Sequence, residues 1–173
     1  MRSPRLSYRP IDARDAGRIA ALAGDWDIAR MTSRIPHPYS LVDADLWIAS
    51  IGDDEFVRGV ERDGELIGAV GYINGDPGQA EIGYWIGKPW WGNGYATEAA
   101  GTLMGYCFSE MNFKRLTCGH FVDNPASARV IAKLGFRRIG AGAQWCEARR
   151  SEVRTVKYAR RRPLLGAWRS GTR

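Results

Sequence analysis

Side chains that bind metals or form disulfides are scarce in this sequence. It has two histidines and three cysteines among 173 residues. Cys107, Cys118 and Cys146 are odd in number, lie far apart and fall in apolar, periodic stretches. This pattern argues against a disulfide framework and against a zinc site, which uses closely spaced pairs. We therefore expect buried, unreactive cysteines and no metal ion.

Long apolar segments are missing too. No apolar run reaches the roughly 20 residues that a membrane-spanning helix needs. Residues 1–10 lack the apolar core of a signal peptide. The sequence therefore predicts a cytoplasmic protein without a membrane partner. Its length of 173 residues fits one domain with a core of its own.

Acidic residues are scarce only toward the C-terminus. The net charge is +6, but residues 149–173 contain nine basic residues and one acid, so the first 148 residues carry −2. Two interpretations stay open for this basic segment. It is either a contact surface for RNA, the ribosome or another anionic partner, or a solvated strand edge followed by a tail.

The most informative segment that is present spans residues 82–98. Apolar side chains alternate along residues 82–86 as in a strand, and a helical period begins at Ala96. Between them, Gly92 and Gly94 permit a tight turn and close approach of the backbone to a ligand. The free N–H groups and positive dipole end at a helix start suit an anionic phosphate. The segment therefore predicts a phosphorylated ligand held by the backbone.

Two other phosphate-binding motifs do not fit this loop. A Walker loop requires Gly-Lys-Ser/Thr after four spacer residues, and the sequence has no such run. A Rossmann fingerprint requires glycines in a 1-3-6 spacing, but the sixth position here is Thr97.

The pattern along the chain predicts an α+β protein rather than a doubly wound sheet. Expected strands cover residues 8–11, 56–61, 65–72, 81–86, 116–122, 136–139, 144–149 and 153–159. Expected helices cover residues 12–24, 26–34, 43–51, 93–111 and 124–134. The pair Asp63-Gly64 indicates a hairpin between the second and third strands.

Four short blocks occur together in a fixed order. They are EIGYWI (81–86), WGNGYATEA (91–99), NPASARV (124–130) and KLGF (133–136). In order and spacing they resemble the GNAT superfamily of acetyl-CoA-dependent N-acetyltransferases, and more narrowly its RimJ/RimL branch. Together the blocks are specific, whereas a glycine-rich loop alone is weak evidence.

The resemblance implies a GNAT fold of the α+β (α/β) type. We expect a mixed, twisted sheet of about seven strands whose central strands, 81–86 and 116–122, splay apart, flanked by about four helices. Residues 1–162 would form a single acetyltransferase domain, and residues 163–173 a basic tail.

The resemblance also implies how acetyl-CoA is held. The pantetheine arm would lie between the splayed strands, and the diphosphate would rest on the glycine-rich loop. The residues implied in this binding are Trp85, Ile86, Trp91, Gly92, Asn93, Gly94, Tyr95, Ala96, Thr97, Asn124, Ser127 and Arg129.

Two side chains are candidates for the chemistry, which needs no metal and no covalent enzyme intermediate. Glu81 is the candidate base or anchor of a water relay, with a structural role as the alternative. Ser127 is the candidate hydrogen-bond donor to the departing sulfur, with a second helix cap beside Asn124 as the alternative. A backbone N–H near Trp85 or Ile86 would stabilise the oxyanion.

Two positions depart from the family pattern. Trp91 stands where relatives usually have Gln or Arg, so it either anchors the loop or forms a wall of the cleft. Ile131 stands where many relatives have a tyrosine that protonates the thiolate. Arg129 and Lys133 either neutralise cofactor phosphates or are plain solvated positions.

The acceptor is an amine, and the resemblance favours the N-terminal amine of a protein, as for ribosomal proteins. The alternatives are a small-molecule amine or antibiotic acceptor, a non-catalytic CoA-binding module, and an RNA-associated module that uses the basic C-terminal segment. Residues 26–39, including His37, are expected to set acceptor selectivity. His120 is expected to be structural, and a homodimer is expected because the branch often dimerises.

Overall fold

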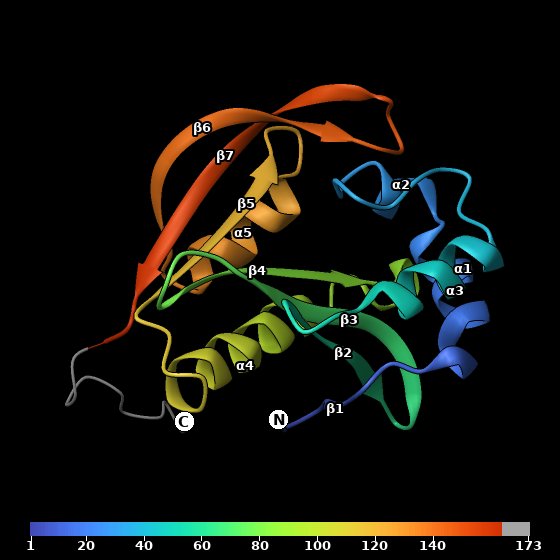
Figure 1. The fold of residues 1–173 in the computed structure, drawn as a ribbon, viewed down its shortest axis with the longest axis horizontal. Helices are drawn as coiled ribbons and strands as arrows, with labels where there is room; N and C mark the ends of the chain where they lie inside the picture. The colour runs from blue at the N-terminus through green and yellow to red at the C-terminus, as the bar shows by residue number, and fades with distance from the viewer. Residues whose placement is uncertain (164–173) are drawn as a thin grey trace.

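The computed structural model describes residues 1–163, so the basic tail expected at 163–173 lies outside the described residues except for its first position. One seven-stranded sheet forms the centre, with the order β1-β2-β3-β4-β5-β7-β6 (Figure 1). The strands are β1 (Ser7–Arg9), β2 (Glu55–Arg62), β3 (Glu65–Asn74), β4 (Gln79–Ile86), β5 (Arg115–Phe121), β6 (Arg137–Cys146) and β7 (Ser151–Arg161). Neighbouring strands are antiparallel except β4 and β5, which are parallel. The expected mixed sheet is confirmed.

Helices cover both faces of this sheet (Figure 1). Within residues 1–163 there are five α-helices: α1 (Ala16–Ala23), α2 (Trp26–Ala29), α3 (Leu41–Ser50), α4 (Tyr95–Ser109) and α5 (Pro125–Lys133). Two 3-10 turns, η1 (Ala13–Asp15) and η2 (Lys88–Trp90), precede α1 and α4. The α4 and α5 face packs against Ile82 and Ile86, whereas α1 and α3 pack with Leu66 and Trp85 on the other face. Successive side chains of β4 point to opposite faces of the sheet, so β4 contributes to the cores on both faces.

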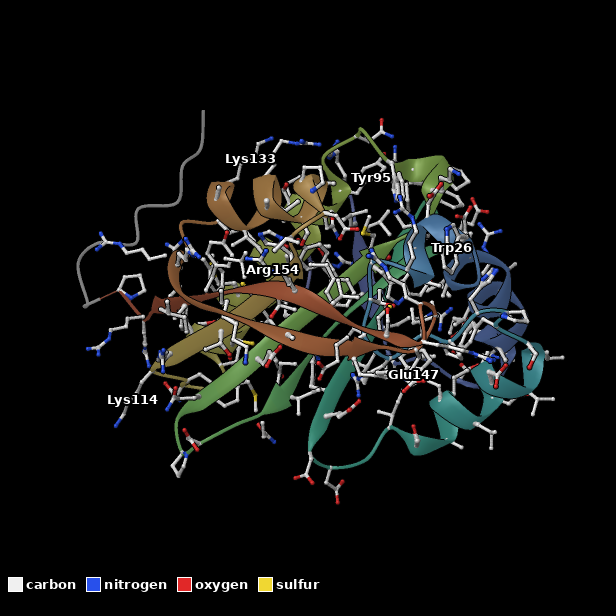
Figure 2. All side chains as sticks on the ribbon, turned by 90° about the horizontal axis from the view of Figure 1, so that it is seen from above. Trp26, Tyr95, Lys114, Lys133, Glu147 and Arg154 are labelled. Carbon is white, nitrogen blue, oxygen red and sulfur yellow. The ribbon has the colours of Figure 1, made fainter. Side chains whose placement is uncertain are left out.

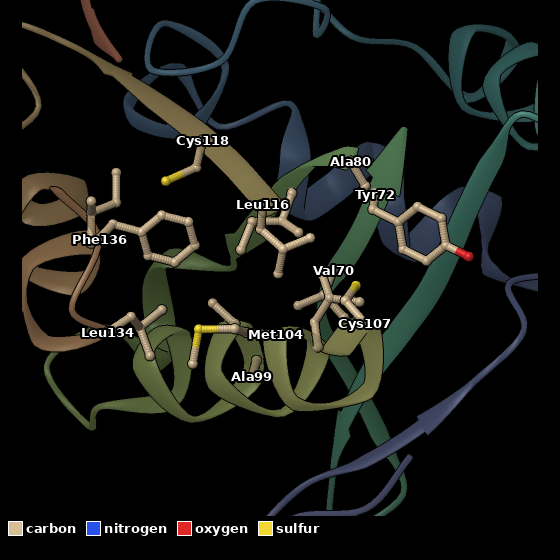
Figure 3. Packing of buried hydrophobic residues seen from close by; sticks show 14 of the residues in the cluster. Val70, Tyr72, Ala80, Ala99, Met104, Cys107, Leu116, Cys118, Leu134 and Phe136 are labelled. Atoms are coloured by element: carbon tan, nitrogen blue, oxygen red, sulfur yellow. The ribbon is translucent and has the colours of Figure 1, made fainter. Parts of the chain in front are cut away.

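The main core lies between α4, α5 and the sheet (Figure 3). Cys107 and Cys118 belong to it, and burial raises the pKa of both thiols to about 12. Cys146 is buried in a smaller cluster beside Ala29 of α2. All three cysteines are free, as the sequence predicts, and behave as small apolar side chains.

The β2–β3 hairpin forms where the sequence predicts it. Asp63 and Gly64, at its turn, have φ angles of 52° and 82°. Two successive positive φ angles match the right-handed twist of the flanking strands, which is why Asp-Gly is favoured there. The expected hairpin is confirmed.

Two strands expected at 136–139 and 144–149 are in fact one strand, β6. The pairing with β7 shifts its register between Arg138 and Gly140 and then continues through Gly140 and Gly142. These glycines are why the sequence predicts a loop there. β6 then ends at Cys146, and Arg150 adopts a φ of 48° in the turn before β7. The prediction of two strands was wrong because a bulge absorbs one residue without ending the pairing.

Several helix boundaries differ from the prediction by a few residues, and two of these differences lie beside the cavity. The helix expected at 26–34 ends at Ala29, and residues 30–34 form turns instead. The helix expected from Asn93 begins at Tyr95, because Gly94 has a φ of +77° and serves as its N-cap. Both differences enlarge the non-helical backbone around the cavity described below.

The middle of the sheet is splayed. β4 and β5 pair only along Gln79–Glu81 and Arg115–Thr117, and then diverge. Beyond this point β4 still pairs with β3, and β5 with β7, so within residues 1–163 each strand keeps one free edge. The expected splay between the two central strands is confirmed. No helix within residues 1–163 is long and apolar enough to cross a membrane.

Candidate active site

A row of backbone N–H groups without acceptors lies between η2 and the first turn of α4. Gly92 and Gly94 have φ angles of +81° and +77°, which lets the chain turn sharply. Within residues 1–163, no acceptor meets the N–H groups of residues 92–97. They point away from the helix together with the positive end of its dipole, so they form a surface of donors suited to an anion.

Side chains fix the shape of this loop. Trp91 Nε1 donates to the carbonyl oxygen of Ile86 at 2.6 Å, which ties the loop to the end of β4. Asn93 Nδ2 donates to the carbonyl oxygens of Trp90 and Trp91 at 3.2 and 3.1 Å. Trp91 also lines the neighbouring cavity, so it combines the two roles that the sequence left open.

Glu98, in the first turn of α4, makes structural contacts. Its Oε1 accepts hydrogen bonds from Ser3 Oγ at 2.8 Å and from the Arg5 N–H at 2.9 Å, and its Oε2 accepts from Arg5 Nε at 2.7 Å. Burial tends to raise the pKa of this carboxyl, but the hydrogen bonds from Ser3 and Arg5 hold it below its usual range. Arg5 Nη1 also donates to the Asn93 carbonyl oxygen at 3.0 Å, so Glu98 supports the loop through Arg5.

A cavity of about 950 Å³ opens beside the loop. We call the part formed by the loop, the diverging strands and α5 its loop side, and the part formed by residues 27–47 with β2 and β3 its α2 side. Of the residues expected to bind acetyl-CoA, those lining the cavity are Trp85, Ile86, Trp91, Gly92, Gly94, Tyr95, Ala96, Thr97, Asn124, Ser127 and Arg129. Asn93 does not line it, and its side chain serves the loop instead.

The free edge of β4 faces the loop side. The Gly87 N–H donates to the Ile67 carbonyl oxygen of β3 at 2.7 Å, and Trp85 lies opposite Ala69 in the same ladder. Because backbone groups alternate between the two edges of a strand, the N–H of Ile86 points toward β5 and that of Trp85 toward β3. Of the two candidate oxyanion donors, only Ile86 therefore has its N–H on the splayed side.

Ser127 lies in the first turn of α5 and has two hydrogen-bond partners. Its N–H donates to Asn124 Oδ1 at 3.0 Å, which is the cap expected from the sequence. Its Oγ lies 2.8 Å from the hydroxyl of Tyr84 on β4. Burial raises the pKa of Tyr84 to about 12. Ile131, at the position of the family tyrosine, is fully buried in the core.

Sequence reasoning missed Tyr84 as a site residue. The alternation of residues 82–86 places Tyr84 on the face that packs against α4 and α5, and this much is readable from the sequence. That its hydroxyl reaches Ser127, 43 positions later, depends on how α5 crosses the splayed strands.

Positive and negative charges occupy different parts of the cavity lining. Arg129 and Lys133 of α5 line the loop side, and Glu81 of β4 lines the cavity where the strands begin to diverge. None of the three has a hydrogen bond or ion pair within residues 1–163. Figure 2 shows Lys133 on α5 and Tyr95 at the start of α4, both at the top of the view. The arrangement offers positive charge beside the donor loop and negative charge away from it.

Charged groups on the α2 side have local partners, and Asp43, which has no ion pair among the described residues, accepts hydrogen bonds from Ser40. Asp27 accepts a hydrogen bond from Lys88 Nζ at 2.7 Å, which lowers its pKa. Arg34 is paired with Glu55 of β2. Apolar side chains also line this side: Ile28, Met31, Ile35, Leu46 and Trp47.

The two histidines have structural contacts. His120 lines the cavity, stacks on Tyr158 and has its Nε2 3.1 Å from the Tyr158 hydroxyl. His37 Nδ1 lies 3.1 Å from the Gly24 carbonyl oxygen, and its ring packs edge-on against Trp26. Within residues 1–163 no group of three His, Cys, Asp or Glu side chains is placed to hold a metal ion.

The turn between β6 and β7 holds the segment 30–34 over the α2 side. The Glu147 N–H donates to the Ser33 carbonyl oxygen at 3.0 Å, and Arg149 Nε donates to the Arg30 carbonyl oxygen at 2.6 Å. Figure 2 shows Glu147 at the end of this hairpin, beside the N-terminal helices. Two segments far apart in sequence therefore enclose the α2 side together.

Comparison with known proteins agrees with this geometry. The family model of the acetyltransferase (GNAT) domain matches residues 5–137. The uncharacterized N-acetyltransferase YoaA of Bacillus subtilis (strain 168) is 30% identical over 155 residues, covering 84% of this chain and 86% of the relative. The uncharacterized N-acetyltransferase p20 of Bacillus licheniformis is 28% identical over 145 residues, covering 79% and 81% of the two chains.

Solved structures share the fold. Mycobacterium smegmatis RimJ in complex with CoA-disulfide superimposes with a TM-score of 0.80 at 20% identity, covering 90% of this chain and 81% of that chain. At this identity the likeness concerns the fold alone. Together with the family model, the splayed sheet and the donor loop, these findings show that the chain belongs to the GNAT family of acetyltransferases.

Proposed function

We propose that this chain transfers the acetyl group of acetyl-CoA directly to a primary amine, and that this amine is the N-terminus of a protein. The observation that carries the proposal is the row of free N–H groups at residues 92–97 beside the free edge of β4. The loop supplies several donors for two phosphates without a cation, and the strand edge supplies hydrogen bonds for an extended amide-containing arm. Arg129 and Lys133 add positive charge on the same side.

The residues divide the chemistry between them. Acetyl-CoA, when bound, supplies an activated thioester. The Ile86 N–H on the splayed edge donates to the oxyanion, and Ser127 Oγ donates to the departing sulfur. Glu81 accepts, directly or through water, the proton that the amine loses. Holding both substrates in one cavity supplies a large entropic part of the acceleration.

The charges of the cavity favour a cationic acceptor without a neighbouring carboxylate. Glu81 attracts a protonated amine, whereas Arg34 on the α2 side is already paired with Glu55. A free amino acid brings a carboxylate that would find no unpaired cation on this side, within the described residues. A peptide N-terminus carries a neutral amide at that place, and the apolar side chains of the α2 side accommodate its first residues.

The test measures thiol release from acetyl-CoA with two panels of acceptors, peptides with different N-terminal residues and small amines including polyamines, amino acids and aminoglycosides. We expect turnover with peptides and little with free amino acids. Glu81→Gln should lower kcat/KM for the amine while the Kd of CoA, measured by calorimetry, stays within about twofold. Glu152→Gln, at an exposed carboxylate on β7 outside the cavity, is the matched control.

Each possible result of these measurements tests a different part of the proposal. No CoA binding by the folded protein would reject the acetyltransferase function as a whole. CoA binding without turnover on either panel would favour a non-catalytic module, and turnover on small amines alone would replace the protein acceptor by a small molecule. Equal activity of Glu81→Gln and the native protein would remove Glu81 from the chemistry.

Two further partner interactions stay predictions. Among the described residues of the basic C-terminal segment, the exposed cations are Arg150, Arg154, Lys157, Arg161 and Arg162. Contact of this segment with RNA or the ribosome should show a steep salt dependence. Homodimerisation is checked by sedimentation.

A further inference from the structure

Two hydroxyl groups meet across the wall of the cavity. Tyr84 Oη of β4 and Ser127 Oγ of α5 lie 2.8 Å apart, and Tyr84 and Ser127 both line the loop side. They come from the strand and the helix that flank the splay, so their contact lies where the arm of acetyl-CoA would pass. The inference that follows rests on the proposed function.

Either hydroxyl of the pair can donate, and the surroundings favour Tyr84 as the donor. Burial keeps the pKa of Tyr84 at about 12, so its phenol carries a proton at neutral pH. The thiol of Cys118 on β5 faces it and has a pKa of about 12 as well, so it adds no charge there. Among the described residues, Tyr84 Oη has Ser127 as its one hydrogen-bond partner. Tyr84 is half-buried and lines the cavity, and Ser127 Oγ is the acceptor among the described residues within reach of its phenol proton.

Ser127 is thereby left with one hydrogen to give. A serine hydroxyl accepts through its lone pairs and donates through its single O–H. Asn124 Oδ1 accepts its hydrogen bond from the Ser127 backbone N–H, not from the Ser127 hydroxyl. With Tyr84 donating to Ser127 Oγ, the Ser127 O–H is directed away from Tyr84. Within residues 1–163 it has no other acceptor.

We propose that Tyr84 is a positioning residue of the transfer reaction, whose hydroxyl orients the Ser127 O–H toward the sulfur that leaves the thioester. In this step the amine nitrogen forms a bond to the acetyl carbon, the carbon–sulfur bond breaks, and sulfur departs with the electron pair. The amine loses one proton to Glu81 or water, and sulfur gains a hydrogen bond from Ser127 and then takes up one proton from water, which replaces the proton that the amine released. Protons and electrons balance without a further reactant.

The Tyr84–Ser127 pair bears on the missing tyrosine of the family pattern. The position of the family tyrosine is occupied here by Ile131, which is buried and has no proton to donate. The phenol of Tyr84 instead reaches the cavity from β4 and meets Ser127 of α5 there. Because Tyr84 donates to Ser127 and not to the substrate, the two hydroxyls act in series and not independently.

The test compares the native protein with Tyr84→Phe, Ser127→Ala and the double variant. Phenylalanine keeps the ring that packs in the core, so the fold should be retained. We expect Tyr84→Phe to lower kcat about tenfold, as losing one oriented hydrogen bond does. The KM for acetyl-CoA and the Kd for CoA should stay within about twofold. The double variant should be no slower than Ser127→Ala, because removing one member already disables the pair.

A second readout does not use turnover. The ultraviolet absorbance of the thiolate reports the pKa of the CoA thiol bound to each variant. Native protein should lower this pKa through the Ser127 hydrogen bond, and Tyr84→Phe and Ser127→Ala should lose the same part of the shift. Tyr106→Phe, which removes a hydroxyl from α4 outside the cavity, is the matched control and should leave kcat and the thiol pKa unchanged.

Three results would overturn the proposal: native kcat in Tyr84→Phe, losses that multiply in the double variant, or a bound-thiol pKa that Tyr84→Phe leaves unchanged. Failure of native protein to bind CoA would instead reject the proposed function, so the two failures are distinguishable. Should Tyr84→Phe not fold, a fluorotyrosine at position 84 keeps ring and hydroxyl and lowers the phenol pKa. Its kcat should then fall at a lower pH than that of native protein, and an unchanged pH profile would reject the role of Tyr84.

Discussion

Trp91 Nε1 donates a hydrogen bond to the carbonyl oxygen of Ile86 at 2.6 Å, across the loop that joins β4 to α4. Trp91 stands where a polar residue is usual. It still makes a polar contact there, because its indole N–H donates a hydrogen bond. The same bond occupies the last acceptor on the free edge of β4, while the Ile86 N–H on that edge stays available.

Replacing Trp91 tests this loop anchor. Trp91→Phe keeps an aromatic ring but loses the donor, so the loop should become looser and the Kd for CoA should rise about three- to tenfold, the value of one hydrogen bond of about 1 kcal/mol. Calorimetry with CoA measures it. Trp145→Phe, on the exposed edge strand β6, is the matched control. Equal affinity in Trp91→Phe and native protein would show that the hydrogen bond does not shape the binding loop.

Gly94 is the position where a side chain should harm binding most. Its φ of +77° is strained by roughly 1–2 kcal/mol for a residue with a Cβ. The strain would shift the N–H groups of residues 92–97. Gly94→Val should therefore raise the Kd for CoA at least tenfold. Gly64→Val imposes a similar φ of +82° at the β2–β3 turn, away from the cavity, and should lower stability without changing the Kd. Undiminished CoA affinity in Gly94→Val would count against the loop as a phosphate site.

Glu98 should contribute to stability in a pH-dependent way. Its pKa is lowered in the folded protein, so its contribution is complete above the unfolded pKa of about 4.3 and disappears as the pH falls through the folded value. Glu98→Gln should therefore be less stable than native protein by about 1 kcal/mol at neutral pH, and the difference should narrow in acid. Urea unfolding at several pH values measures it.

The control for Glu98 is Glu65→Gln, which removes the surface pair with Arg18 and should cost less than 1 kcal/mol. A stability difference for Glu98→Gln that stays constant from neutral pH into acid would mean that the carboxylate charge is not what Ser3 and Arg5 recognise.

Arg129 and Lys133 should act through charge. A cation near the bound diphosphate attracts it electrostatically, and dissolved salt screens this attraction. Arg129→Ala should therefore raise the Kd for CoA several-fold at low salt and less at high salt. Titration calorimetry at two ionic strengths measures both. Arg138→Ala on β6, outside the cavity, is the control. A Kd that does not respond to Arg129→Ala at low salt would leave this residue as a solvated position on α5.

Local signals in the sequence account for much of this fold. Asp63-Gly64 sets a hairpin by its own backbone preference, and Asn124 caps α5 through its own side chain. Gly92 and Gly94 identify the donor loop because glycine alone adopts such φ angles easily. Each of these features depends on residues that are close together in the chain.

The features that escaped prediction depend on distant residues. The contact of Tyr84 with Ser127 requires the crossing of α5 over the splay, and the enclosure of the α2 side requires the β6–β7 turn to reach residues 30–34. The bulge at Arg138–Gly140 hid the continuity of β6, because glycines in a strand and in a loop look alike in sequence.

The short pairing of β4 with β5 has a mechanical consequence. Strands β1–β4 and strands β5–β7 form two half-sheets joined by three residue pairs, with α4 and α5 bridging them on one face. A ligand arm that forms hydrogen bonds to both free edges would connect the two half-sheets. Binding between β4 and β5 should then slow amide hydrogen exchange along both strands, so that the protein is most rigid when acetyl-CoA is bound.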